Sequence, residues 1–368
     1  MTPWPSCKQR SLFTLTNAIL IAACGGEIPT APDLLGLDAG LSGDGGRIQI
    51  DAGSGSGASG GAKDAGTRDA GPSTCGAELF KSTRLAANML IVLDRSGSMS
   101  SSASQNTSGP FVSKMKSAQD ALVRVANTSA GKIFLGLSTY PSNSNSCGAG
   151  QVLVPIGPSS SNAIAAALPG VTPFGSTPTG PALQLAGTQA ALKDSSRANY
   201  ILLVTDGAEG CGGNSRAEVK KLADAGIKTY VVGFGDGVDS AALNDLATFG
   251  GTARPTGTTK YYQANQPAEL QSALDAIAAG AVGCNYKLGK APPDVNKLYV
   301  YVGGTLQSRD ASHATGWDYN AATNAITLYG TTCETVTKNA ATAVNIVYGC
   351  PDSFLGETEP PSDAGVFQ

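Results

Sequence analysis

The chain has 368 residues, enough for two modest domains with flanking segments. Its formal net charge is −3, so it lacks the large basic field on which nucleic-acid binding depends. Hydrophobic residues make up 41%, an ordinary share for a globular protein, whereas only 14% are charged. This polar but weakly charged composition is common in exported proteins and argues against a nucleic-acid partner.

Residues 1–23 have the pattern of an export signal. Lys8 and Arg10 give a positive start, and residues 12–23 form an apolar stretch too short for a membrane-spanning helix. The end of this stretch, from Leu20 to Cys24, resembles a bacterial lipobox, in which the cysteine is lipidated and begins the mature protein. The resemblance predicts lipid anchoring through Cys24 to the bacterial outer membrane or cell surface. The alternative is an ordinary signal peptide with a chance cysteine.

Residues 24–74 predict a flexible linker. Gly, Ala, Ser and Asp dominate this segment, and the tripeptide Asp-Ala-Gly occurs in it four times. It contains too few large apolar residues to offset the conformational entropy that folding removes. The linker would hold a folded region away from a membrane. Residues 351–368 contain Pro360-Pro361 and a fifth Asp-Ala-Gly, and they predict a disordered tail.

Between residues 75 and 284, helical and strand patterns alternate. This order predicts an α/β domain with a doubly wound, mostly parallel sheet flanked by helices. Apolar runs such as 88–93 and 200–205 are typical of central parallel strands. The expected strands are 88–93, 132–138, 151–155, 200–205, 227–234 and 260–263. The expected helices are 112–126, 161–168, 181–192, 215–225, 240–249 and 267–279.

Oxygen-bearing side chains follow two of these strands and precede one helix. Asp94, Ser96 and Ser98 alternate directly after strand 88–93, Asp206 follows strand 200–205, and Thr177 precedes helix 181–192. Ligands of open α/β sheets bind outside the carboxyl ends of the strands. Carboxylates and hydroxyls suit a hard divalent cation. Each segment also has a simpler interpretation, namely an Asx-turn, a tight turn and a helix cap, respectively.

Taken together, in this order and spacing, the three segments resemble the metal-ion-dependent adhesion site of the von Willebrand factor A domain. The resemblance covers about residues 85–281. It implies a metal held by hydroxyls and carboxylates, some through water, with the ligands Asp94, Ser96, Ser98, Thr177 and Asp206. Six oxygen ligands with retained waters fit Mg²⁺ or Mn²⁺ better than Ca²⁺. In related domains the metal takes one further oxygen from an Asp or Glu of a protein partner.

Residues 285–350 predict a small β-rich domain, because 297–302, 325–329 and 343–348 are rich in β-branched and aromatic residues. The run from Trp317 to Tyr319 belongs either to the core of this domain or to an aromatic contact surface. His313 is the only histidine, which argues against a Ser-His-Asp triad.

The chain has eight cysteines, of which Cys7 lies in the export signal and Cys24 would carry lipid. The remaining six suggest three disulfides in an oxidising compartment, with fifteen possible pairings. Chain topology and the resemblance favour one set, Cys75–Cys284, Cys147–Cys211 and Cys333–Cys350.

The leading functional hypothesis is a metal-dependent adhesion or protein-binding module on a bacterial envelope. The alternative is a structural scaffold subunit of an envelope complex, in which the metal serves stability only. A metal-assisted hydrolase is least favoured, because the sequence offers no evident general base beside the metal. We therefore do not expect an enzyme.

Overall fold

The computed structural model describes residues 77–103, 111–339 and 341–350. The predicted export signal, Cys24, the linker, Cys75 and the predicted tail lie outside the described residues. Among the described residues, no helix has the length and apolar character needed to cross a membrane.

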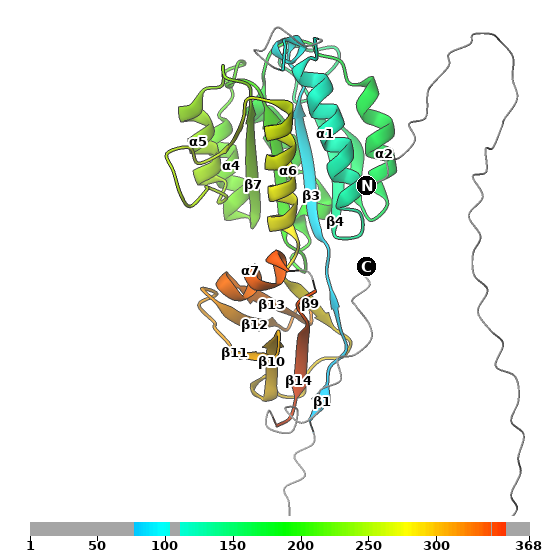
Figure 1. Ribbon diagram of the computed structural model, residues 1–368, viewed down its shortest axis with the longest axis vertical. Helices are drawn as coiled ribbons and strands as arrows, with labels where there is room; N and C mark the ends of the chain where they lie inside the picture. Colours follow the sequence, from blue (N-terminus) through cyan, green and yellow to red (C-terminus); the bar gives the residue numbers. More distant parts are fainter. Residues whose placement is uncertain (1–76, 104–110, 340, 351–368) are drawn as a thin grey trace, which may run out of the picture. The chain divides into compact units, whose positions relative to one another are not determined.

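One six-stranded sheet forms the centre of the larger region, in the order β5-β4-β3-β6-β7-β8. Figure 1 labels its strands β3, β4 and β7. All neighbouring strands are parallel except β5, which pairs antiparallel with β4 at one edge. The doubly wound, mostly parallel sheet predicted from the sequence is confirmed. The strands are β3 (Ala87–Asp94), β4 (Ile133–Tyr140), β5 (Gln151–Gly157), β6 (Asn199–Thr205), β7 (Ile227–Phe234) and β8 (Tyr262–Ala264).

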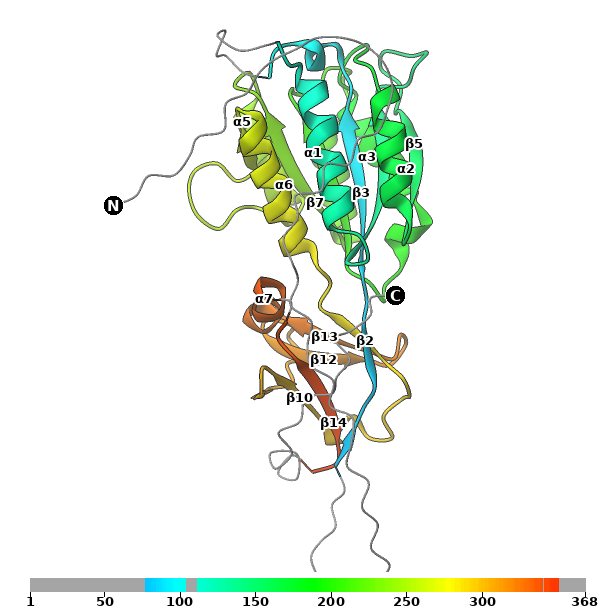
Figure 2. The same cartoon turned by 45° about the vertical axis from the view of Figure 1, so that its right-hand side comes forward.

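Helices cover both faces of this sheet (Figures 1 and 2). Every residue of β3 is buried, and its side chains alternate between the two faces. Met89, Ile91 and Leu93 join one core, whereas Leu90 and Val92 join the other. The first core contains side chains of α1 (Lys114–Thr128), α2 (Ser160–Ala167) and α6 (Pro267–Ala281). The second contains side chains of α3 (Thr179–Gly187), α4 (Ser215–Asp224) and α5 (Ser240–Phe249).

The helix expected over 181–192 is shorter than its pattern suggested. Helix α3 ends at Gly187, and a separate 3₁₀ turn, η3 (Ala190–Lys193), follows. A Cβ at position 187 would lie 2.9 Å from Leu222 Cδ2, so glycine allows α3 to approach α4 closely. Glycine is also a weak helix former, which agrees with the end of α3 at this residue. The other 3₁₀ turns of this region are η1 (Gly97–Ser100) and η2 (Leu168–Gly170).

A strand-rich region contains two further sheets, in the orders β1-β14-β10-β11 and β12-β13-β9-β2. The expected strands 297–302, 325–329 and 343–348 correspond to β10, β13 and β14. The helix α7 (Gly330–Lys338) and the 3₁₀ turn η4 (Val295–Lys297) are additional to the expectation. The strands are β1 (Glu78–Leu79), β2 (Ser82–Arg84), β9 (Asn285–Leu288), β10 (Leu298–Val302), β11 (Thr305–Gln307), β12 (Gly316–Asn320), β13 (Ala325–Tyr329) and β14 (Val344–Tyr348).

Both ends of the described chain build this strand-rich region. Glu78 of β1 pairs with Tyr348 of β14, and Ser82 of β2 pairs with Leu288 of β9. Phe80, between these strands, is buried in the core of the region. The expected domain limits, 75–284 and 285–350, therefore need correction, because residues 78–84 belong to the second region and the central sheet starts with β3. Strands β1 and β2 are too short to show a recognisable strand pattern in the sequence.

The disulfides differ in part from the expectation. The Cys147–Cys211 bond is confirmed. Cys284 is bonded to Cys333, so the expected pairings Cys75–Cys284 and Cys333–Cys350 are wrong. Cys284 is buried in the core of the strand-rich region, beside α7, and the β2–β9 pairing already holds the two ends of the α/β domain together. Cys350 is also disulfide-bonded.

Trp317 belongs to the core rather than to a contact surface. Its side chain is buried among the apolar residues of the strand-rich region, and its Nε1 donates to the Gln307 carbonyl at 3.0 Å. His313 Nε2 lies 3.1 Å from Asp318 Oδ2, and its ring stacks on Tyr329. The histidine therefore takes part in a local contact within the strand-rich region.

Candidate metal centre

The candidate centre lies where β3 and β6 end side by side. The two strands are parallel, and Leu93 pairs with Val204 in register. Asp94 is the last residue of β3, and Asp206 directly follows β6. The strand order reverses here, because β4 lies on one side of β3 and β6 on the other. Such a switch point is where open α/β sheets bind ligands.

Asp94 is fully buried and accepts two short hydrogen bonds. Its Oδ1 accepts from the Ser96 backbone N at 2.7 Å, so the Asx-turn considered above is present. Its Oδ2 accepts from the Thr205 hydroxyl at 2.6 Å. Burial raises the pKa of Asp94 to about 6, even though the bonds from Thr205 and Ser96 favour the charged form. The charge of Asp206 makes a smaller contribution to this rise in pKa.

The side chains of Ser96, Ser98 and Asp206 are in direct contact. Ser98 donates to Asp206 Oδ1 at 2.7 Å, and the Ser96 and Ser98 hydroxyl oxygens lie 3.0 Å apart. The Nζ of Lys114 donates to Asp206 Oδ2 at 2.9 Å. Four of the five expected ligands therefore form one hydrogen-bonded group, since Asp94 is joined to it through Ser96.

The fifth expected ligand, Thr177, lies on a loop that touches both strand ends. The Gly97 backbone N donates to the Gly175 carbonyl at 3.0 Å, and the Gly210 backbone N donates to the Thr177 carbonyl at 2.9 Å. The Thr177 hydroxyl oxygen lies 3.9 Å from the position that a Cβ on Gly207 would take. The Thr177 side chain is therefore next to the turn that follows Asp206.

Arg95 connects the loops around the centre. Its side chain is buried, and Nε donates to the Thr172 carbonyl at 2.7 Å. Its Nη1 donates to Asn143 Oδ1 in the loop after β4, and its guanidinium lies over the Phe174 ring at 5.7 Å. One side chain thus joins the end of β3 to two other loops, which fixes the position of the Asp94 turn.

The Cys147–Cys211 disulfide makes a second connection between loops. It joins the loop after β4 to the loop after β6. Next to it, the Ser146 carbonyl accepts from the Ser176 backbone N at 3.1 Å, and the two serine hydroxyl oxygens lie 3.2 Å apart. Ser176 directly precedes Thr177. The disulfide therefore anchors Ser146, the residue to which the Thr177 loop is hydrogen-bonded.

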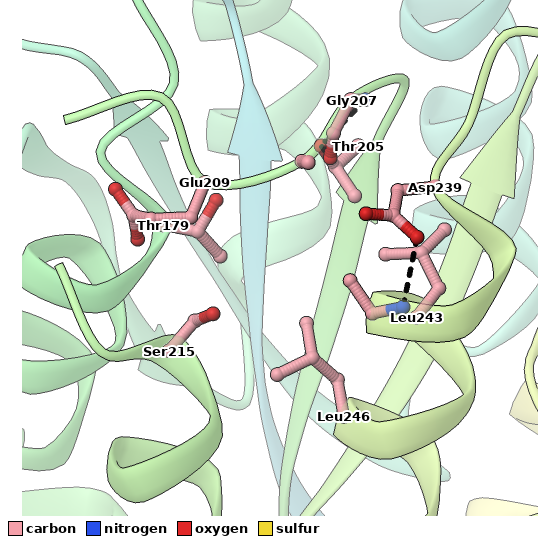
Figure 3. A pocket seen from close by; sticks show the side chains of 10 residues that line it. Thr179, Thr205, Gly207, Glu209, Ser215, Asp239, Leu243 and Leu246 are labelled. Atoms are coloured by element: carbon pink, nitrogen blue, oxygen red, sulfur yellow. Dashed lines mark hydrogen bonds between the residues drawn. The ribbon is translucent and has the colours of Figure 1, made fainter. Parts of the chain in front are cut away.

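A pocket of about 220 Å³ adjoins the centre (Figure 3). Thr205, which bonds to Asp94, lines it, and Leu243 and Leu246 give it an apolar side. Two acids also line it. Glu209 Oε2 accepts from the Gly180 backbone N at 2.6 Å, and Asp239 caps α5. Asp239 therefore has a structural role at the start of a helix.

The oxygen atoms gathered here suit a hard divalent cation. They are two carboxylates and neighbouring hydroxyls, which are ligands that Mg²⁺ and Mn²⁺ accept. Among the described residues, no group of three or more His, Cys, Asp or Glu is arranged to hold a metal. A metal at this place would therefore depend on the serine and threonine hydroxyls as well as on the acids.

Residues 88–276, more than half of the chain, match the family model of the von Willebrand factor type A domain. The chain belongs to this family.

Three solved structures illustrate the likeness. BatB from Bacteroides thetaiotaomicron is 18% identical, with a TM-score of 0.41, over 52% of this chain and 96% of that chain. Proximal thread matrix protein 1 from the mussel byssus is 15% identical, with a TM-score of 0.42, over 58% of this chain and 49% of that chain. The pilus adhesin SpaC from Lactobacillus rhamnosus GG is 14% identical, with a TM-score of 0.42, over 72% of this chain and 39% of that chain. Likeness at this level carries no inference about function. Comparison with curated proteins finds no match.

Sequence reasoning missed three residues of the centre. Thr205 directly follows the apolar run from Ile201 to Val204 and is polar, which is a signal that it faces a polar neighbour. Arg95 stands inside the Asp94–Ser98 motif, and a charged residue directly after a buried strand is a similar signal. Lys114 begins a helix, and nothing in the local pattern separates it from a solvent-exposed lysine.

Proposed function

We propose that this protein is a divalent-metal-dependent adhesion or protein-binding module, in which the metal bridges to an acidic side chain of a protein partner. The observation that carries the proposal is the Ser98–Asp206 hydrogen bond, at the carboxyl ends of two adjacent parallel strands. It brings a hydroxyl from one strand end to a carboxylate from the other, with Ser96 and Asp94 joined to them.

The proposed ligands are Asp94, Ser96, Ser98, Thr177 and Asp206. Two carboxylates balance the charge of one divalent ion, so the ion keeps the capacity to take one further anionic oxygen. A partner's Asp or Glu would supply that oxygen, and the neighbouring pocket has room for an adjoining side chain of the partner. The ion is Mg²⁺ or Mn²⁺ in this proposal, with Ca²⁺ a poorer fit.

We further propose that the protein is exported and attached through lipid on Cys24 to the outer membrane or cell surface. The disulfides Cys147–Cys211 and Cys284–Cys333 support passage through an oxidising compartment. The apolar stretch before Cys24 and its lipobox-like end support the lipid anchor.

One observation favours the second candidate, a scaffold subunit. The Lys114 ammonium pairs with Asp206, so this buried carboxylate has a counter-charge without any metal. In a scaffold, partner binding would not depend on the metal. We do not propose an enzymatic reaction, because no imidazole lies at the centre and the sole histidine belongs to the strand-rich region.

The experiment compares Thr177→Ala with Thr172→Ala, a control in the same loop whose exposed side chain lies outside the proposed ligand set. Each immobilised protein is mixed with cell-surface extracts in Mg²⁺ and then washed with EDTA. A partner held in Mg²⁺ by the wild type and by Thr172→Ala, released by EDTA and absent from Thr177→Ala supports the proposal. Circular dichroism tests whether both variants are folded. A partner that stays bound in EDTA supports the scaffold instead.

A further inference from the structure

The carboxylate of Asp206 has a partner outside the expected ligand set. The side chain of Asp206 has no exposed surface and that of Lys114 is 12% exposed, with Nζ 2.9 Å from Oδ2. The other carboxylate oxygen accepts from Ser98 at 2.7 Å. A buried carboxylate without a counter-charge is strongly unfavourable, so Lys114 makes this arrangement possible in the absence of a metal.

The chain holds Lys114 in this place from two sides. Its backbone N donates to the Ser101 carbonyl at 2.9 Å, directly after the 3₁₀ turn that contains Ser98. On the other side, Gly235 follows β7 with a φ of +106°. A Cβ at position 235 would lie 2.8 Å from Lys114 Cε and 2.9 Å from Nζ. Glycine at this position therefore leaves the space that the lysine side chain occupies.

We propose that Lys114 is an internal counter-ion of the candidate metal centre. Its ammonium pairs with Asp206 in the metal-free protein and leaves Asp206 when a divalent cation is bound. The inference rests on the metal-dependent function proposed above. A cation on Ser98 and Asp206 would stand next to the ammonium, and two like charges at such a short distance repel each other strongly.

This arrangement has two consequences. Lys114 weakens the affinity of the centre for a divalent cation, because the ion pair with Asp206 is lost on binding. It also stabilises the metal-free protein, because the buried carboxylate keeps a counter-charge. A partner carboxylate adds negative charge at the centre, so it favours the metal-bound form over the lysine-paired form.

Lys116 provides a matched control on the same helix. It pairs with Asp120 on the surface of α1, where both side chains are about 60% exposed. Exposed pairs of this kind contribute little to stability. Replacing Lys116 removes the same charge from α1 without touching Asp206.

The test uses the full-length wild type, Lys114→Met and Lys116→Met. Calorimetric titration with MgCl₂ and MnCl₂ measures the affinity, and thermal unfolding in EDTA measures the stability of the metal-free protein. We expect Lys114→Met to bind Mg²⁺ at least about tenfold more tightly and to unfold at a lower temperature in EDTA. Lys116→Met should match the wild type in both measurements. Should Lys114→Met fail to fold, Lys114→Gln keeps an N–H donor for Asp206 and should show the same tighter binding.

The outcomes separate this inference from the proposed function. A folded Lys114→Met or Lys114→Gln that binds Mg²⁺ no more tightly than the wild type overturns the inference and leaves the metal centre standing. Binding by Lys114→Met alone would show that Lys114 blocks the centre instead of leaving Asp206, and it would contradict both the inference and metal-dependent function in the wild type. No binding by any of these proteins up to about 10 mM, above the usual range of extracellular divalent-cation sites, overturns both.

Discussion

Removing the Cys147–Cys211 disulfide separates its effect on stability from its effect on the candidate metal centre. The bond joins residues 64 positions apart, and the chain-entropy relation gives about 4 kcal/mol for a loop of that length. The Cys284–Cys333 bond joins residues 49 positions apart and gives about 4 kcal/mol by the same relation. The two bonds are therefore matched in their expected contribution to stability, although only the first lies beside the candidate centre.

The effect on metal binding should differ between the two bonds. Ser146, next to Cys147, holds Ser176 through a backbone hydrogen bond and a hydroxyl contact, and Ser176 precedes Thr177. Without the disulfide, the loop that carries Thr177 loses part of its support. Removing groups that orient metal ligands typically weakens metal affinity by about 10- to 100-fold. We expect a loss of about tenfold for the Cys147→Ser/Cys211→Ser protein and none for Cys284→Ser/Cys333→Ser.

The assay has two parts. Urea unfolding followed by circular dichroism gives the free energy of unfolding, and calorimetric titration with MgCl₂ gives the affinity. Both double-serine proteins should lose about the same stability, whereas only Cys147→Ser/Cys211→Ser should bind Mg²⁺ more weakly. Equal Mg²⁺ affinity in the two proteins would refute the link between this disulfide and the Thr177 loop.

Two further predictions concern the metal-free protein in EDTA. Because burial raises the pKa of Asp94 from 3.8 to about 6, its charged form costs about 3 kcal/mol of stability near neutral pH, and the cost fades as the pH falls through 6 toward 3.8. In Asp94→Asn the amide still accepts from Ser96 N and can donate to the Thr205 hydroxyl. In urea unfolding, this variant should therefore be more stable than the wild type at about pH 7 and nearly as stable as the wild type at about pH 4. A variant that is less stable than the wild type at about pH 7 would contradict this account. Gly150 has a φ of +89°, and a Cβ there would lie 2.0 Å from a carbonyl oxygen of β4. Gly150→Ala should lower the free energy of unfolding by about 2 kcal/mol or more. Gly157→Ala is the control and should not lower it, because its Cβ would meet nothing within 4 Å. Similar thermal unfolding of the two variants would show that an alanine at position 150 causes no backbone strain.

Much of the α/β domain could be predicted because its strands are long and apolar. The run expected at 88–93 is β3 (Ala87–Asp94), and 200–205 lies within β6 (Asn199–Thr205). The carboxyl ends of neighbouring parallel strands meet at one edge of the sheet. The resemblance to the von Willebrand factor A domain implied that these two strands are neighbours, and with it the positions of Asp94 and Asp206 predicted that they lie together.

The strand-rich region could be predicted only in part, because residues far apart in the sequence build it. Strands β1 and β2 have two and three residues, too few for a recognisable pattern, yet they pair with β14 and β9. The expected cysteine pairings were wrong because the domain limits were wrong. Cys284 was taken as the end of the α/β domain and was therefore paired with Cys75 at its start. Lys114 was missed for a similar reason, because its contact with Asp206 joins residues 92 positions apart.

The most direct test of the metal centre is calorimetric titration of MgCl₂ and MnCl₂ into the wild type and Asp94→Asn. The variant keeps the shape of the buried side chain and is expected to fold at least as well, so a loss of binding reports on the ligand itself. We predict binding at one site in the wild type and none in Asp94→Asn. Absence of binding in the wild type, or equal binding in both proteins, would contradict the proposed centre.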